Sequence, residues 1–176
     1  MNPWLKRLLI VVGSLVVLLV AVTLWGALLP PTHSLTRSAL YRQPPDLVWR
    51  AIATFPAQPS WRPDVGSVER LADRNGHEVW KEADRRGGGV AFETLESVYP
   101  RRLVRRSVDE GLPFGGTWSQ VLTPEGSGTR LSITEDGVVR NPFFRFVVRV
   151  VFGYARTADL YLKNLGTRFG EEITPQ

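Results

Sequence analysis

The sequence predicts an α+β protein: one membrane-spanning helix, followed by a domain in which an antiparallel sheet packs on a long C-terminal helix. Three observations lead to this prediction. The chain opens with a long uncharged apolar run, continues with six short segments of β-forming residues separated by turn signals, and ends with one amphipathic helical pattern. No internal repeat is present, so we expect a single folded domain beyond the apolar run.

The apolar run at residues 8–29 has the length and composition of a membrane span. It contains 22 residues and no charge. A helix of that length measures about 33 Å, which is enough for a hydrocarbon core of about 30 Å. Trp4 and Trp25 stand near its ends, where interfacial tryptophans are common. We therefore expect an uncleaved membrane anchor.

A cleaved signal peptide is the competing interpretation of this run. Its apolar region is typically about 7–15 residues and ends at small residues. The Trp-Gly-Ala sequence at 25–27 matches such a cleavage site poorly, which favours the anchor. Lys6 and Arg7 favour an inside N-terminus, although Arg37 and Arg42 oppose it. The prediction is a single-pass protein of the bacterial cytoplasmic membrane with its domain on the extracytoplasmic side.

The chain divides into five parts on these grounds. Residues 1–7 flank the membrane helix at 8–29, residues 30–33 form a short linker, residues 34–170 form the domain, and residues 171–176 are a tail. The linker is short and rich in proline, so the domain is expected to lie close to the bilayer.

The domain begins with one strand candidate and two short helices. Residues 34–42 are a short strand candidate. A proline pair and Asp46 precede residues 47–55, whose apolar side chains form one helical stripe. Proline in a first turn and an acidic residue near the positive end of the helix dipole both favour a helix start. Three prolines limit the following residues, 57–64, to a short helix or turn.

Six strand candidates follow. They lie near residues 65–71, 77–83, 90–99, 103–109, 117–123 and 129–138, with glycine, proline and Asn-Gly signals between them. Consecutive strands joined by short turns predict an antiparallel meander.

A final helix is expected to begin at Asn141-Pro142 and to continue as one element to about Phe169. Its apolar face contains Phe144, Val147, Val151, Ala155, Ala158, Leu162, Leu165 and Phe169, with Tyr154 and Tyr161 at the border. Such a face needs one large apolar surface, which a curved sheet supplies.

Composition and missing motifs exclude several classes of protein. The chain has two histidines and no cysteine, so a zinc site of ordinary ligands is not expected. Nucleotide-binding and hydrolase motifs are absent, and no metal or cofactor is predicted. Apart from Lys6 and Arg7, the chain carries 20 basic and 17 acidic residues without a basic run, so nucleic acid is not a predicted partner.

Two stretches resemble a known superfamily. They are PPDLVWRAIATFPAQPSWRPDVGSVE at 44–69 and PRRLVRRSVDEGLPFGGTWSQVLTPEGSGTRLSITEDGVVRNPFFRFVVRVVFGY at 100–154. The chain resembles the SRPBCC superfamily, the START and Bet v 1-like helix-grip proteins, in particular its polyketide cyclase/dehydrase-like members. The resemblance covers residues 34–170 and is most specific over 110–141. It implies a seven-stranded antiparallel sheet gripping the long C-terminal helix, with two short helices closing one end.

The same resemblance implies a cavity between sheet and helix that binds hydrophobic molecules. Strand alternation and the apolar helix face indicate its lining, and Trp61 lies near the cavity mouth in the family arrangement. The expected ligand-contacting residues are Trp61, Phe92, Phe114, Trp118, Gln120, Leu131, Ile133, Glu135, Val151, Tyr154 and Ala158. Glu96 is expected on the same strand face as Phe92. An inward Glu135 can orient a ligand or act as a general acid with a raised pKa. The alternative is that Glu135 lies at the end of its strand in contact with water, or forms an ion pair with a nearby arginine.

The connection after Asp109 lies at the cavity entrance in the resembling fold. Residues 112–114 are therefore expected to form part of a lid, and the glycines at 115–116 to turn the chain into the strand of Trp118. The alternative is that Phe114 caps the core.

Three functions follow as hypotheses, because a fold of this kind does not fix function. The first is membrane-anchored binding of a lipid or other hydrophobic small molecule. The second is a cyclase or dehydratase acting on a polyketide-like substrate, with catalytic residues unassigned. The third is a membrane-tethered sensor or module for an unidentified protein partner. Two or more convergent ionisable groups in the cavity wall would favour the enzyme hypothesis. A purely apolar wall would favour a ligand carrier or a sensor.

Overall fold

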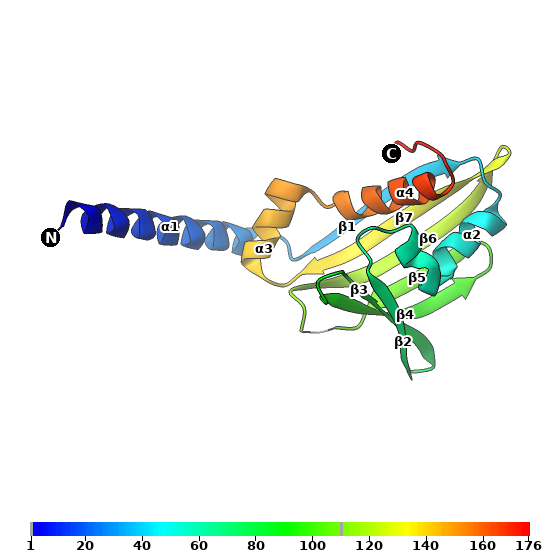
Figure 1. Ribbon diagram of the computed structural model, residues 1–176, viewed down its shortest axis with the longest axis horizontal. Coiled ribbons are helices and arrows are strands. Elements are labelled where there is room, and N and C mark those ends of the chain that lie inside the picture. The colour runs from blue at the N-terminus through cyan, green and yellow to red at the C-terminus, as the bar shows by residue number, and fades with distance from the viewer. Residues whose placement is uncertain (1, 110) are drawn as a thin grey trace.

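Seven antiparallel strands form one curved sheet in the order β1-β7-β6-β5-β4-β3-β2 (Figure 1). The computed structural model describes residues 2–109 and 111–176. The strands are β1 (Thr32–Tyr41), β2 (Ser67–Arg74), β3 (His77–Ala83), β4 (Gly89–Val98), β5 (Arg102–Ser107), β6 (Phe114–Glu125) and β7 (Gly128–Val139). The predicted six-strand meander is confirmed, and the first strand of the domain completes the sheet by pairing with the last.

The helices lie at both ends of this meander. They are α1 (Pro3–Leu28), α2 (Pro45–Ala53), the 3-10 helix η1 (Phe55–Ser60), α3 (Pro142–Val147), the π-helix η2 (Val148–Phe152) and α4 (Arg156–Arg168). α1 projects away from the domain and is apolar enough to cross a membrane (Figure 1). α4 lies across the sheet, with α2 and η1 at one end, and this arrangement confirms the α+β helix-grip class.

The expectation of one unbroken helix over residues 142–169 is wrong. The hydrogen-bonding ladder widens to a π-helix at Val148–Phe152 and ends at Gly153, whose φ of +72° is a left-handed conformation. Within residues 142–169, α4 is the segment that covers the sheet. α3 packs on the C-terminal end of α1 instead (Figure 1). Phe144 of α3 and Val151 of η2 are exposed.

β6 begins at Phe114, earlier than the strand predicted near residues 117–123. Phe114 is the first residue of β6 and pairs with Val139 of β7, so it does not stand at a loop tip. Gly116 has a φ of +151°, and a Cβ there would lie 2.4 Å from the carbonyl oxygen of Asp136. The strand can therefore pass this point only with glycine. Glu110 lies outside the described residues.

A β-bulge in β4 corrects the placement of Glu96. The register shifts between Thr94 and Glu96, so Thr94 faces Arg105 while Glu96 faces Val104. The extra residue reverses the alternation of side chains. Glu96 therefore does not share the inner face with Phe92, and it pairs with Arg102 at a half-exposed position.

The core between sheet, α2 and α4 consists mainly of apolar side chains. Its fully buried side chains include Ile52, Leu103, Leu131, Ile133, Leu162 and Leu165. Tyr41 of β1 is also fully buried, and its hydroxyl donates a hydrogen bond to the Leu162 carbonyl of α4 at 2.8 Å. This bond ties the edge strand of the sheet to the helix that covers it.

We expect Tyr41→Phe to lower the free energy of unfolding by about 1 kcal/mol, because it removes one buried hydrogen bond and little volume. Tyr99→Phe is the matched control, since Tyr99 is exposed and its hydroxyl can exchange a partner for water. The measurement is chemical denaturation of the full chain in detergent, followed by tryptophan fluorescence. Equal midpoints for both variants and the wild type would contradict a role for this bond.

Candidate functional site

A cavity of about 280 Å³ lies between the inner face of the sheet and α4. Its lining comes from β3, β4, β5, β6, β7, α4 and the segment after η1. The residues are Arg62, Glu82, Val90, Phe92, Arg105, Ser107, Phe114, Gly115, Gly116, Trp118, Gln120, Glu135, Thr157 and Tyr161. The lining combines aromatic walls with a small set of charged groups, as ligand pockets commonly do.

The aromatic wall forms where α4 meets β6. The Tyr161 ring packs edge-on against Trp118, with ring centroids 5.9 Å apart, and against Trp61, at 5.3 Å. Burial raises the pKa of Tyr161, so its hydroxyl stays neutral. Phe92 and the half-exposed Phe114 extend this surface along the sheet. The wall therefore offers flat apolar faces to a ligand.

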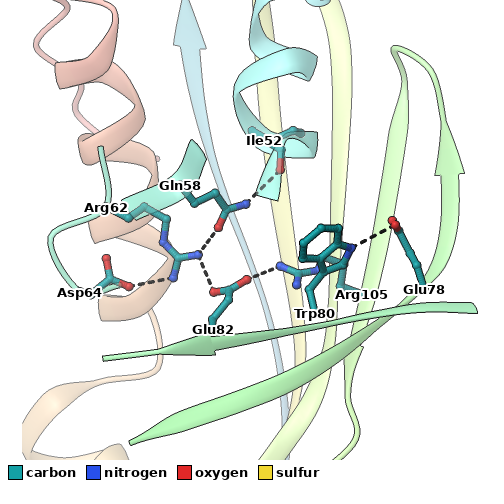
Figure 2. A network of polar contacts seen from close by, with 8 residues as sticks. All are labelled: Ile52, Gln58, Arg62, Asp64, Glu78, Trp80, Glu82 and Arg105. Atoms are coloured by element: carbon teal, nitrogen blue, oxygen red, sulfur yellow. Dashed lines mark hydrogen bonds and ion pairs between the residues drawn. The ribbon is translucent and has the colours of Figure 1, made fainter. Parts of the chain in front are cut away.

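The polar floor is built around one buried carboxylate. Glu82 of β3 lies between Arg62, whose Nη1 donates to Oε2 at 2.7 Å, and Arg105 of β5, whose Nη1 donates to Oε1 (Figure 2). Burial alone would raise the pKa of Glu82, but Arg105 and Arg62 outweigh it and hold that pKa below its ordinary value. Glu82 is therefore ionised and is shared by two guanidinium groups.

The two arginines are held from several sides. Arg62 also donates to Gln58 Oε1 at 2.7 Å and to Asp64 Oδ2 at 2.8 Å, and Gln58 in turn donates to the Ile52 carbonyl (Figure 2). The Arg105 guanidinium lies 4.2 Å from the Phe55 ring centroid. A fixed guanidinium needs no reorganisation when it receives a ligand.

Some donors of this floor remain free. Among the described residues, the buried Arg62 Nε and the buried Arg105 Nε and Nη2 have no hydrogen-bond partner. Unpaired buried donors are costly, and each is expected to have a water or ligand oxygen as its partner. The floor can therefore accept a carbonyl, hydroxyl or carboxylate oxygen.

A second polar group lies in the wall. Glu135 Oε1 of β7 lies 3.4 Å from His33 Nε2 of β1, and the His33 ring stacks on Tyr154 with centroids 3.9 Å apart. Burial raises the pKa of Glu135, and the neighbouring His33 and Trp118 offset only part of that rise. Within the described part of the chain, buried Glu135 Oε2 and His33 Nδ1 lack partners. Glu135 is thus a carboxyl group suited to holding a proton.

The structure brings together five of the sequence-predicted site residues. Phe92, Phe114, Trp118, Gln120 and Glu135 line the cavity. Leu131, Ile133 and Ala158 are buried in the core beside it, and Trp61 stands behind Tyr161. Tyr154 reaches the site only through His33. Val151 lies on the exposed π-helix, away from the cavity, because the C-terminal helix breaks before α4.

Sequence reasoning missed the charged floor. Arg105 alternates with Leu103 and therefore shares its inward face, and Glu82 alternates with Trp80 in the same way. Both positions carry this signal, but charged residues in strands are usually assigned to the solvent face. Arg62 comes from an irregular segment after η1, where no periodicity indicates the direction of a side chain.

Several solved structures have a fold similar to that of this chain. The Zhui aromatase/cyclase from Streptomyces sp. R1128 matches with a TM-score of 0.62 and 17% identity, over 78% of this chain and 93% of that one. Protein MLL2253 from Mesorhizobium loti matches with a TM-score of 0.60 and 17% identity, over 78% and 97%. Norcoclaurine synthase from Thalictrum flavum matches with a TM-score of 0.61 and 10% identity, over 80% and 88%.

At these identities the solved structures show a shared fold and do not transfer a reaction. No curated protein sequence gives a significant match. A family model, described as polyketide cyclase / dehydrase and lipid transport, matches residues 32–169, which is nearly the whole domain beyond α1. The chain therefore belongs to the polyketide cyclase / dehydrase and lipid transport family.

Proposed function

We propose that the protein is a membrane-anchored module that binds a small amphiphilic molecule between its sheet and α4. The observation that carries the proposal is the cavity itself, with apolar aromatic walls and a floor of two guanidinium groups that hold free donors. The apolar body of the ligand packs on Trp118, Tyr161 and Phe92. Its oxygen-bearing end, preferably an anion, receives hydrogen bonds from Arg62 and Arg105.

The volume of the cavity limits the size of this ligand. At about 280 Å³ it lies near the lower end of the range for small-molecule pockets, roughly 300–1,000 Å³. A small ring system or a single short chain fits this space better than a two-chain lipid. The ligand class is therefore a compact amphiphile rather than a whole phospholipid.

The anchor in this proposal is α1, which crosses the cytoplasmic membrane with its N-terminus inside. Its best window has a mean hydropathy of 2.9. Lys6 and Arg7 precede the apolar run, and positive residues favour the cytoplasmic side. The domain then lies outside the cytoplasm, next to the bilayer.

A cyclase or dehydratase is the second candidate, and convergent ionisable groups favour it. A purely apolar carrier does not need Glu135 beside His33 in the wall, facing the arginines of the floor. In a dehydration, a base removes the proton next to a ligand carbonyl, and an acid protonates the departing hydroxyl to release water. Protonated Glu135 supplies the acid, and the guanidinium groups stabilise the negative charge that develops on the carbonyl oxygen.

We expect Phe114→Ala to weaken binding of a fluorescent fatty-acid probe by about 1–2 kcal/mol, or roughly 5- to 30-fold, because one apolar contact at the rim is lost. Phe114 is 49% exposed, so its removal should change the free energy of unfolding by less than about 1 kcal/mol. Leu40→Ala, an exposed apolar truncation outside the cavity, is the control. Unchanged affinity in a folded Phe114→Ala variant, or no binding by the wild type, would count against the site.

Trp118→Ala is expected to reduce both affinity and stability, since Trp118 packs on the core.

The protonation of Glu135 provides a pH test of ligand binding. The raised pKa keeps Glu135 neutral above the ordinary carboxyl value of about 4.3. As pH rises through the raised pKa, the wall gains a negative charge, and affinity for an anionic probe should fall. Glu135→Gln should remove this fall, whereas Glu125→Gln, on the exposed end of β6, should retain it. A profile that is the same in all three proteins would refute the role of Glu135 in binding.

The dehydratase hypothesis is tested with the same variant, Glu135→Gln. If the domain is a dehydratase, the wild type should release water from a β-hydroxy ketone, with the conjugated product followed by absorbance. Glu135→Gln should then slow turnover by about 10²- to 10⁴-fold while it still binds the probe. Probe binding without turnover in the wild type leaves the binding module as the function.

The orientation of the anchor is tested by protease added to intact spheroplasts. We expect digestion of the domain, because Lys6 and Arg7 hold the N-terminus inside. A cytoplasmic marker protein should survive the same treatment. Full protection of the domain, or a mature N-terminus that begins after Gly26, would show that the anchor or its orientation is wrong.

A further inference from the structure

Residues 142–152, which form α3 and η2, expose a cluster of large apolar side chains. Phe144, Val150, Val151 and Phe152 are all exposed, and Val151 reaches 63%. This segment is not part of the core between sheet and α4. An exposed apolar cluster of this kind commonly marks a contact with a membrane or another macromolecule.

The same segment is docked against the C-terminal end of α1. A Cβ on Gly26 would lie 1.9 Å from the carbonyl oxygen of Pro142, so glycine allows the two backbones to meet. The rings of Trp25 and Phe146 pack with centroids 5.5 Å apart. α3 is therefore fixed to the helix that we propose as the membrane span, as Figure 1 shows.

Arg145 strengthens this junction. Its Nη1 donates to the carbonyls of Gly26 at 3.3 Å and of Leu29 at 3.1 Å at the end of α1, where helix carbonyls need partners from outside the helix. A cation at this end also complements the helix dipole. The junction is thus held by a backbone contact, a ring pair and a charged cap.

The charge of the segment fits an anionic surface. No acidic residue lies between Asp136 and Asp159, whereas this stretch contains Arg140, Arg145, Arg149 and Arg156. Residues 142–152 are too few to span a bilayer, for which about 20 residues are needed. A short helical segment with exposed apolar side chains and arginines suits the interface of an anionic bilayer.

We propose that residues 142–152 are a second membrane contact, which lies on the bilayer surface beside the end of α1 and holds the cavity rim toward the lipid. The rim is coupled to this contact through Arg140. The Arg140 backbone N–H donates to Pro113 at 2.7 Å, and its guanidinium donates to the carbonyls of Leu112 and Phe114. The proposal rests on the membrane anchoring by α1 described above, and it adds the surface and the orientation through which an amphiphile leaves or enters the bilayer.

The chain has no cysteine, so single labels are simple to introduce. Val151→Cys carries an environment-sensitive fluorophore in the full chain, reconstituted in vesicles of phosphatidylcholine and phosphatidylglycerol. We expect a blue-shifted emission that lipids spin-labelled near the headgroup quench several-fold. Val150→Cys is a second label on the same surface, and Ser127→Cys, in the exposed turn between β6 and β7, is the matched control that should stay water-like and unquenched.

Gly26→Ala tests the junction, because the added methyl group cannot fit against Pro142. Alanine is the better helix former, so α1 itself should not weaken. We expect the quenching at position 151 to fall toward the control value. Gly13→Ala, where a Cβ meets nothing within 4 Å, should leave the quenching unchanged.

The outcomes separate this inference from the proposed function. Water-like emission at 150 and 151 in protein that floats with the vesicles would overturn the second contact and leave the anchor in place. Protein that does not float with vesicles would overturn the anchor. A blue shift that persists in detergent and grows with protein concentration would indicate a second copy of the chain on this surface and would also overturn the proposal. Binding of the fatty-acid probe in detergent depends on none of these results.

Discussion

Glu82 buried between Arg62 and Arg105 is the interaction on which the site depends. Placing charges in a protein interior costs several kcal/mol for each ion, and close pairing with additional hydrogen bonds offsets that cost. The pairing joins three separate parts of the chain, namely the segment after η1, β3 and β5. Removing one member of a buried ion pair typically costs about 3–5 kcal/mol, because the remaining charge is left unpaired. The two guanidinium groups of the cavity floor are therefore held in place by the fold.

The walls show why a cavity remains between sheet and helix. α4 is held near one end of the sheet by Tyr41 and by fully buried leucines. Toward its N-terminal end, Thr157 and Tyr161 meet the rings and glycines of β6 without filling the space. A helix that was continuous with α3 would extend its apolar face further over the sheet. The break at Gly153 instead releases α3 to α1 and leaves the rim of the cavity lined by Phe114 and two glycines.

The same break connects the site with α1. β6 begins at Phe114 and β7 ends at Val139, next to Arg140, and α3 follows directly and packs on α1. A ligand site, its rim and the helix proposed to cross the membrane are thus joined by one continuous set of contacts. For an apolar ligand with low solubility in water, a rim close to the bilayer shortens the path through solvent. This coupling gives a physical reason for a membrane span on a domain of this family.

Local pattern in the sequence was sufficient to predict the class of fold, the apolar helix and the approximate strands, because each depends on periodicity and turn residues within a short window. It also predicted that Trp118, Gln120 and Glu135 point inward, since strand alternation determines faces without knowledge of partners. Glu96 was misplaced because a bulge reverses alternation and is visible only in the pairing with β5. Val151 was misplaced because helical spacing continues through Gly153, and only the competition between α1 and the sheet for the same apolar face decided where α3 packs. The charged floor depends on three distant segments of the chain meeting in the interior. Tertiary structure alone therefore determined that Glu82 has two arginine partners and that these line the cavity.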